Sequence, residues 1–185
     1  MDLCTYHSHC NFCDGKAPAE DFVRAAIEAG FHSYGISSHS PLPFETRWSL
    51  SKGNVEAYLM ELKRLQEKYA GQIELYVGME IDYLNDDWGP AVEYFQRMPL
   101  DYRIGSVHLV TEEQTGEIMD MDGKFEDFRE NLRMVFRDDL KYLVEAYFKA
   151  SSRMVELGGF DFVAHLDKIS MNGSLMDSTL TKQVV

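Results

Sequence analysis

The chain of 185 residues is long enough to bury one hydrophobic core, so we expect a single domain over residues 1–185. Acidic residues outnumber basic ones by 31 to 18, and the resulting net charge of −13 argues against nucleic acid and anionic membranes as partners. No apolar run approaches the roughly 20 residues that span a bilayer, no basic-then-apolar leader is present, and the cysteines are odd in number, so we expect a cytoplasmic protein.

Short buried-strand patterns alternate with amphipathic segments along the chain. We predict strands at residues 3–6, 33–37, 73–79, 102–107 and 160–164. We predict helices at residues 18–29, 54–69 and 90–96, and two more within 125–157 with a break near Arg137. Residues 109–124 read as a polar loop, and no element is predicted after Ile169. The alternation of strand and helix indicates an α/β fold with a parallel sheet.

The first predicted strand is followed by His7 and His9. Alternate residues of an extended chain point the same way, so the two imidazoles would project together. Paired neutral imidazoles suit zinc, manganese or iron. The motif alone is weak evidence, because two residues at this spacing often occur by chance.

Each later predicted strand is followed by a residue of a type that commonly binds metals. These residues are, in order, His39, Glu80, His108 and His165. The carboxyl ends of parallel strands meet at one face, where α/β barrels have their active sites. We therefore predict that these residues form a metal centre with His7 and His9. The remaining histidine, His32, precedes its strand and is interpreted as structural.

Four acidic or thiol-bearing residues lie close to these residues in sequence. Asp14 follows the histidine pair and is a further candidate ligand. Asp82 would either share the role of Glu80 or orient a ligand. A redox or zinc pair formed by Cys10 and Cys13 is disfavoured, because the sequence has no second cysteine pair.

Five motifs occur in an order that carries a family resemblance. They are DLCTYHSH (2–9), GISSH (35–39), GMEIDY (78–83), IGSVH (104–108) and GFDFVAHLD (159–167). With them the chain resembles the PHP (polymerase and histidinol phosphatase) domain family, and most closely its histidinol-phosphatase branch, from residue 2 to about 170. The resemblance implies a distorted TIM-like barrel of seven β/α units, of which about five are present here.

The resemblance also implies two to three divalent transition metals (Zn, Mn or Fe). His7, His9 and Glu80 would hold the first metal. Glu80, His108 and His165 would hold the second, and Asp14 and His39 would contribute to the third. The family supplies two more ligands from an Asp-x-His that has no counterpart after His165, so we expect a C-terminally truncated member with an uneven metal set and self-association through open strand edges.

The function implied by the resemblance is metal-assisted hydrolysis of a small phosphate monoester, L-histidinol phosphate, in histidine biosynthesis. Arg47, in the loop after the second strand, is either a ligand of the substrate phosphate or a surface residue. One alternative is another PHP phosphoesterase that acts on nucleotides or oligonucleotide ends. A second alternative is a non-catalytic remnant that binds a metal or a partner.

Overall fold

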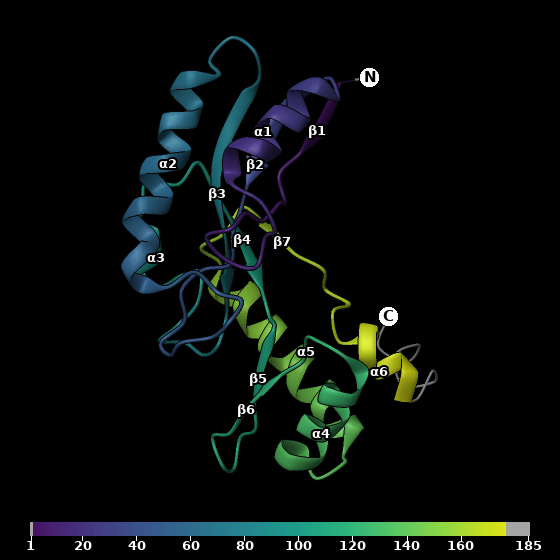
Figure 1. Cartoon of the computed structure of the whole chain (residues 1–185). Helices are drawn as coiled ribbons and strands as arrows, with labels where there is room; N and C mark the ends of the chain where they lie inside the picture. Colours follow the sequence, from purple (N-terminus) through teal and green to yellow (C-terminus); the bar gives the residue numbers. More distant parts are fainter. Residues whose placement is uncertain (1, 177–185) are drawn as a thin grey trace.

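The computed structural model describes residues 2–176, and its centre is a curled parallel sheet of five strands (Figure 1). The strands lie in the order β1-β2-β3-β4-β7, and each neighbouring pair is parallel. Their bounds are β1 Leu3–Thr5, β2 Phe31–Ile36, β3 Glu74–Asp82, β4 Tyr102–Ser106 and β7 Phe162–Val163. The predicted α/β fold with a parallel sheet is confirmed, in the form of an open half-barrel.

The helices form two groups, of which the first covers the outer face of this sheet (Figure 1). The first group packs on β2 and β3 and includes α1 (Ala19–Glu28) and α2 (Val55–Lys68), the latter preceded by a 3-10 turn at Lys52–Asn54. On α2 the side chains of Tyr58, Leu62 and Leu65 repeat at helical spacing and are fully buried. The second group, α4 (Phe125–Phe136) and α5 (Leu140–Leu157), has a separate apolar core.

The predicted break between the last two long helices is confirmed. Arg137 and Asp138 have φ angles of 55° and 62°, which end α4 in the left-handed region. The side chain of Asp139 then accepts a hydrogen bond from the backbone N–H of Tyr142 and caps α5.

Three sequence-based expectations are wrong in detail. Residues 109–124 are not a loop throughout, because β5 (Leu109–Thr111) and β6 (Ile118–Asp120) form an antiparallel hairpin. The expected helix over 90–96 shrinks to the single turn α3 (Glu93–Gln96). A further helix, α6 (Ser170–Met176), follows Ile169, whose side chain is buried in the second core. No described helix combines the length and apolarity needed to cross a membrane.

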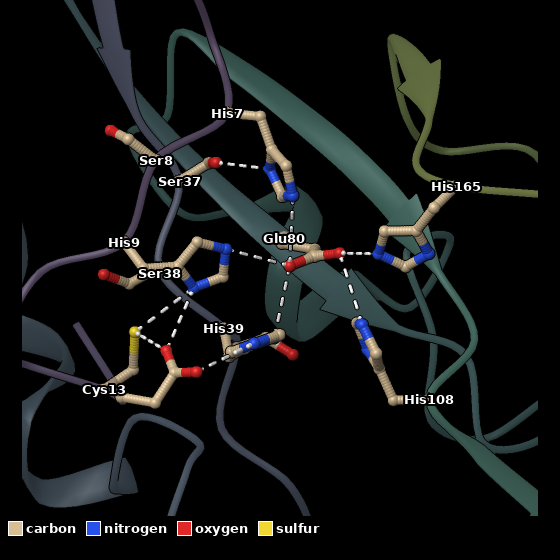
Figure 2. A network of polar contacts seen from close by, with 12 residues as sticks. His7, Ser8, His9, Cys13, Ser37, Ser38, His39, Glu80, His108 and His165 are labelled. Carbon is tan, nitrogen blue, oxygen red and sulfur yellow. Dashed lines mark hydrogen bonds and ion pairs between the residues drawn. The ribbon is translucent and has the colours of Figure 1, made fainter. Parts of the chain in front are cut away.

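Strand β3 continues three residues beyond its expected end, to Asp82, and therefore contains Glu80. The backbone N–H of Glu80 donates to the carbonyl of Ser38, and its carbonyl accepts from the N–H of Ser40. On the other side, β4 pairs with β3 as far as Asp82. Alternation along β3 directs Val77, Met79 and Ile81 to the helix-covered core. Glu80 faces the inside of the half-barrel (Figure 2), where Asp82 contacts His108.

The ring of Tyr102 connects the inside of the sheet to the first histidines. It lies against Gly35 and Gly78, where a Cβ atom would approach within 2.3 Å and 2.1 Å of it. Its hydroxyl donates a hydrogen bond of 2.6 Å to the carbonyl of Tyr6. The two glycines thus make room for a side chain that fixes the backbone immediately before His7.

Candidate functional site

Glu80 lies at the centre of a cluster of five histidines at the carboxyl edge of the sheet (Figure 2). Its side chain is 1% exposed. Oε2 of Glu80 lies 3.7 Å from His7 Nε2, 3.3 Å from His9 Nε2 and 3.2 Å from His39 Nδ1. Oε1 lies 3.6 Å from His108 Nε2 and 3.0 Å from His165 Nε2. The structure therefore brings together the six residues for which a shared centre was expected, which are His7, His9, His39, Glu80, His108 and His165.

Two of the histidine rings are oriented by a neighbour on the side away from Glu80. His7 Nδ1 lies 3.0 Å from the Ser37 hydroxyl, and His108 Nδ1 lies 2.7 Å from Asp82 Oδ1. Each contact leaves the Nε2 atom of that ring to face Glu80 (Figure 2). Asp82 Oδ1 thus orients the His108 ring, as a group behind a ligand would. Its buried Oδ2 has no hydrogen-bond partner among the described residues, and Asp82, His39 and His108 have donor atoms close enough to hold an ion, so both roles considered for Asp82 stay predictions.

The residues of the cluster shift one another's pKa values. Burial favours the neutral acid at Glu80, but hydrogen bonds from His165 and His9 outweigh it and hold the pKa of Glu80 well below its usual value. Burial also disfavours the charged form of His9, yet contacts with Cys13 and Glu80 raise the pKa of His9 to about 10. Burial lowers the pKa of His39 to about 4, so that imidazole is neutral at pH 7.

The donor set fits divalent cations. Imidazole nitrogens around one carboxylate are ligands that zinc and related metals take. The Nδ1 atom of His39 is buried and has no hydrogen-bond partner among the described residues, although it lies 3.2 Å from Glu80. A buried imidazole nitrogen without a hydrogen bond is available to bind a cation, and His9, His39 and Glu80 have donor atoms within 4.8 Å of one another that could hold one.

Asp14 and Cys13 extend the cluster on the His9 side. Asp14 Oδ1 lies 3.3 Å from His9 Nδ1, and its Oδ2 lies 3.9 Å from His39 Nε2. Cys13 Sγ lies 3.5 Å from the same nitrogen of His9, whereas Cys10 is buried against Ser38. The two thiols thus have different surroundings, and only Cys13 faces the histidines.

Beside His39 and His108, the cavity has a wall that the sequence did not predict. The cavity measures about 520 Å³, and this wall is formed by Trp48, Asp120, Asp122 and Lys168. The indole of Trp48 donates to Asp120 Oδ2 at 2.9 Å, and Lys168 Nζ lies 2.7 Å from Asp122 Oδ1. Two short apolar runs, Leu109-Val110 and Ile118-Met119, flank a polar turn with Gly116 and were the sequence signal for the hairpin, whose second strand contains Asp120 and ends two residues before Asp122.

Two residues singled out in the sequence lie outside this cavity. Arg47 is exposed and lines a neighbouring hollow beside Trp48 and Phe44, so the structure does not place it with the histidines. His32 is the second residue of β2 and lies 3.7 Å from Glu74 at the other end of the sheet. Both members of that pair are more than half exposed, so it contributes little to stability.

Comparison with known proteins adds a family match and several relatives. The PHP domain family matches residues 5–184. A Deinococcus radiodurans protein named "Probable histidinol-phosphatase" is 26% identical over 174 residues, which cover 89% of this chain and 60% of the relative. The Bacillus subtilis histidinol-phosphatase is 25% identical over 135 residues, which cover 63% of this chain and 47% of the relative. The chain thus spans about half the length of these curated relatives.

Two solved structures share the fold. The Listeria monocytogenes protein HisK matches with a TM-score of 0.72 at 22% identity, covering 98% of this chain and 79% of that one. The Lactococcus lactis histidinol phosphate phosphatase, solved with zinc, L-histidinol and phosphate, matches with a TM-score of 0.50 at 18% identity, covering 97% and 92%. At these identities the likeness establishes the architecture alone.

Proposed function

Because the chain belongs to the PHP domain family, we propose that it is a metal-dependent phosphate-monoester hydrolase whose substrate is L-histidinol phosphate. One observation carries the proposal: a single buried carboxylate, Glu80, has imidazole nitrogens facing each of its two oxygens. A bridging carboxylate between two ligand sets is a means of holding two divalent cations close together.

Both oxygens of Glu80 face histidine nitrogens, so this carboxylate could serve more than one cation. In our proposal, which follows the family resemblance, one cation would be held by His7, His9 and Glu80, and a second by Glu80, His108 and His165. The donor atoms that lie within 4.8 Å of one another group differently, as His7, Glu80 and His165 and as His9, His39 and Glu80. Asp14 and His39 would contribute to a third. Zinc, manganese and iron all accept this combination of imidazole and carboxylate.

The bound cations would neutralise the phosphoryl oxygens and lower the pKa of the attacking water. Hydrolysis adds that water to phosphorus, breaks the bond from phosphorus to the ester oxygen, and leaves the alcohol with a proton. The protein's own contribution is positional, because phosphoryl transfer depends on placement and charge more than on a protein nucleophile. Asp82 and Ser37 contribute by fixing the rings of His108 and His7.

The choice of substrate rests on the relatives and on the cavity. The curated relatives that match carry the name histidinol-phosphatase. A cavity of about 520 Å³ suits a small phosphorylated molecule rather than a polymer, and its wall carries the carboxylates of Asp120 and Asp122. An acidic wall is unfavourable for the repeated phosphates of a polynucleotide.

Phosphate release by the purified 185-residue chain tests the proposal. We expect release from L-histidinol phosphate in the presence of zinc or manganese, little release from a panel of nucleotides, and none after chelation. The Glu80→Gln variant is the matched control, because it has the same shape without the bridging charge. Preference for a nucleotide would favour another PHP phosphoesterase activity. Tight metal binding without hydrolysis of any ester would favour a non-catalytic role.

A further inference from the structure

The cavity contains one permanently positive side chain among the residues that the structure describes as lining it, and that side chain is Lys168. The lysine follows His165 by three residues, and its backbone N–H donates to the carbonyl of His165 in a tight turn. Its side chain is 19% exposed, so most of its length is covered by protein. The turn therefore holds the ammonium at the rim of the histidine cluster.

A single carboxylate, that of Asp122, lies between the Lys168 ammonium and the histidine cluster. Lys168 Nζ is 2.7 Å from Oδ1 of Asp122, and the other oxygen of that carboxylate is 3.9 Å from Nε2 of His108. The same nitrogen of His108 lies 3.6 Å from Glu80. Asp122 is the only ion-pair partner of Lys168 within residues 2–176, so ammonium protons are left for another acceptor.

We infer that Lys168 binds the phosphoryl group of the substrate, the role that sequence reasoning offered to Arg47. The inference rests on the proposed function and adds to it the protein group that contacts the phosphate. A phosphate monoester in the cavity brings two negative charges to a wall already lined by Asp120 and Asp122. Lysine provides a compact charge with three donors, which suits a phosphate whose oxygens also face other ligands.

A different role for Lys168 would be to neutralise Asp122 and nothing more. The two roles differ in what happens when Asp122 is removed. If the lysine acts only through that carboxylate, its own removal has no effect once the carboxylate is gone. If it contacts phosphate, its removal costs the same in either background. A double-mutant cycle separates these two roles.

The experiment measures binding of inorganic phosphate to the zinc-loaded 185-residue chain by calorimetry. We expect Lys168→Met to weaken phosphate binding about tenfold or more, and Lys168→Arg to retain most of the affinity. We also expect the Lys168→Met effect to persist in an Asp122→Asn background. Zinc content and far-UV circular dichroism should stay unchanged in all variants. Lys149→Met is the matched control, because Lys149 pairs with exposed Glu113 away from the cavity.

Phosphate affinity unchanged in Lys168→Met would overturn the inference, and so would an effect that disappears in the Asp122→Asn background. Failure of the zinc-loaded wild-type chain to bind phosphate would overturn it as well. The proposed function is judged separately, by hydrolysis of L-histidinol phosphate. If the chain binds phosphate through Lys168 but hydrolyses only another ester, the inference about Lys168 holds and the proposal of L-histidinol phosphate as the substrate is wrong.

Discussion

Asp82 holds the ring of His108 from the side opposite Glu80. Its Oδ1 atom lies 2.7 Å from His108 Nδ1 and accepts the backbone N–H of the same residue at 3.0 Å. Both side chains are buried, and burial disfavours the charged imidazole, but the charge of Asp82 raises the pKa of His108 to about 9. The contact with Asp82 sets which nitrogen of His108 faces the centre.

Glu80 and Asp82 should therefore differ in their effect on metal binding. Glu80→Gln removes a carboxylate proposed to bridge two cations, so we expect it to abolish binding of at least one of them. Asp82→Asn leaves every proposed ligand in place and should weaken zinc affinity by about 10–100-fold. Equilibrium titration with zinc, followed by metal analysis of the dialysed protein, measures both. A larger loss for Asp82→Asn than for Glu80→Gln would reverse the two assignments.

Tyr58 should be important for stability because its hydroxyl joins two strands beneath the site. The fully buried hydroxyl donates to the carbonyl of Gly78 at 2.7 Å and accepts the N–H of Ser38 at 3.2 Å. Tyr58→Phe leaves both backbone groups unpaired and should lower the free energy of unfolding by about 1–3 kcal/mol in urea. Tyr94→Phe is the control, since Tyr94 is 41% exposed. Equal effects of the two substitutions would contradict the argument.

Glu20 should make stability depend on acid pH. Its carboxylate receives contacts from Lys68, Arg64 and Tyr69, which lower its pKa from 4.5 to about 2. A depressed pKa in the folded state stabilises the fold above pH 4.5, and this contribution disappears as the pH falls towards 2.

The measurement is the Tm of Glu20→Gln and wild type between pH 7 and pH 2. We expect a lower Tm for the variant at pH 7 and a difference that narrows as the pH falls. Glu28→Gln on the same helix is the control, because Glu28 forms none of the ion pairs found within residues 2–176. A difference that is constant with pH would show that the ion pairs are not its source.

The 185-residue chain is expected to self-associate. Strands β1 and β7 are the outer strands of the described sheet, and exposed apolar side chains gather at β7 and after it. Among them Phe162 is 39% exposed, Leu166 55% and Leu175 64%. Unpaired strand edges beside apolar surface favour association.

Sedimentation velocity over a range of concentrations tests this expectation. The average mass of the wild-type chain should rise with concentration, and Leu166→Lys combined with Leu175→Lys should reduce that rise. Met60→Lys is the control, because Met60 is 65% exposed but lies on α2, away from both edges. A wild-type chain that remains monomeric at every concentration would contradict the expectation that the unpaired strand edges cause association.

The sequence by itself determined the order of the parallel strands and the residues that gather at their ends. In a βαβ arrangement these features are local, because each strand carries its own polar residue at its carboxyl end and the parallel direction brings those ends to one edge. For this reason the sequence alone grouped six residues into one site, namely His7, His9, His39, Glu80, His108 and His165. The break at Arg137 was likewise local, because two like-charged aspartates follow it where the apolar pattern is interrupted.

Only the tertiary structure determined which side chains line the cavity together with the histidines. Trp48 contacts Asp120, which lies 72 residues away, and Lys168 contacts Asp122, which lies 46 residues before it. Such contacts depend on how the β5–β6 hairpin and the turn after β7 pack together, and neither position follows from periodicity in the sequence. The position of Arg47 was not predictable for the same reason. Arg47 lies in the loop after the second strand, as expected, but it lines a neighbouring hollow beside Trp48 and not the cavity of the histidines. Strand ends are set by local pattern, whereas the loops above them are set by contacts between distant segments.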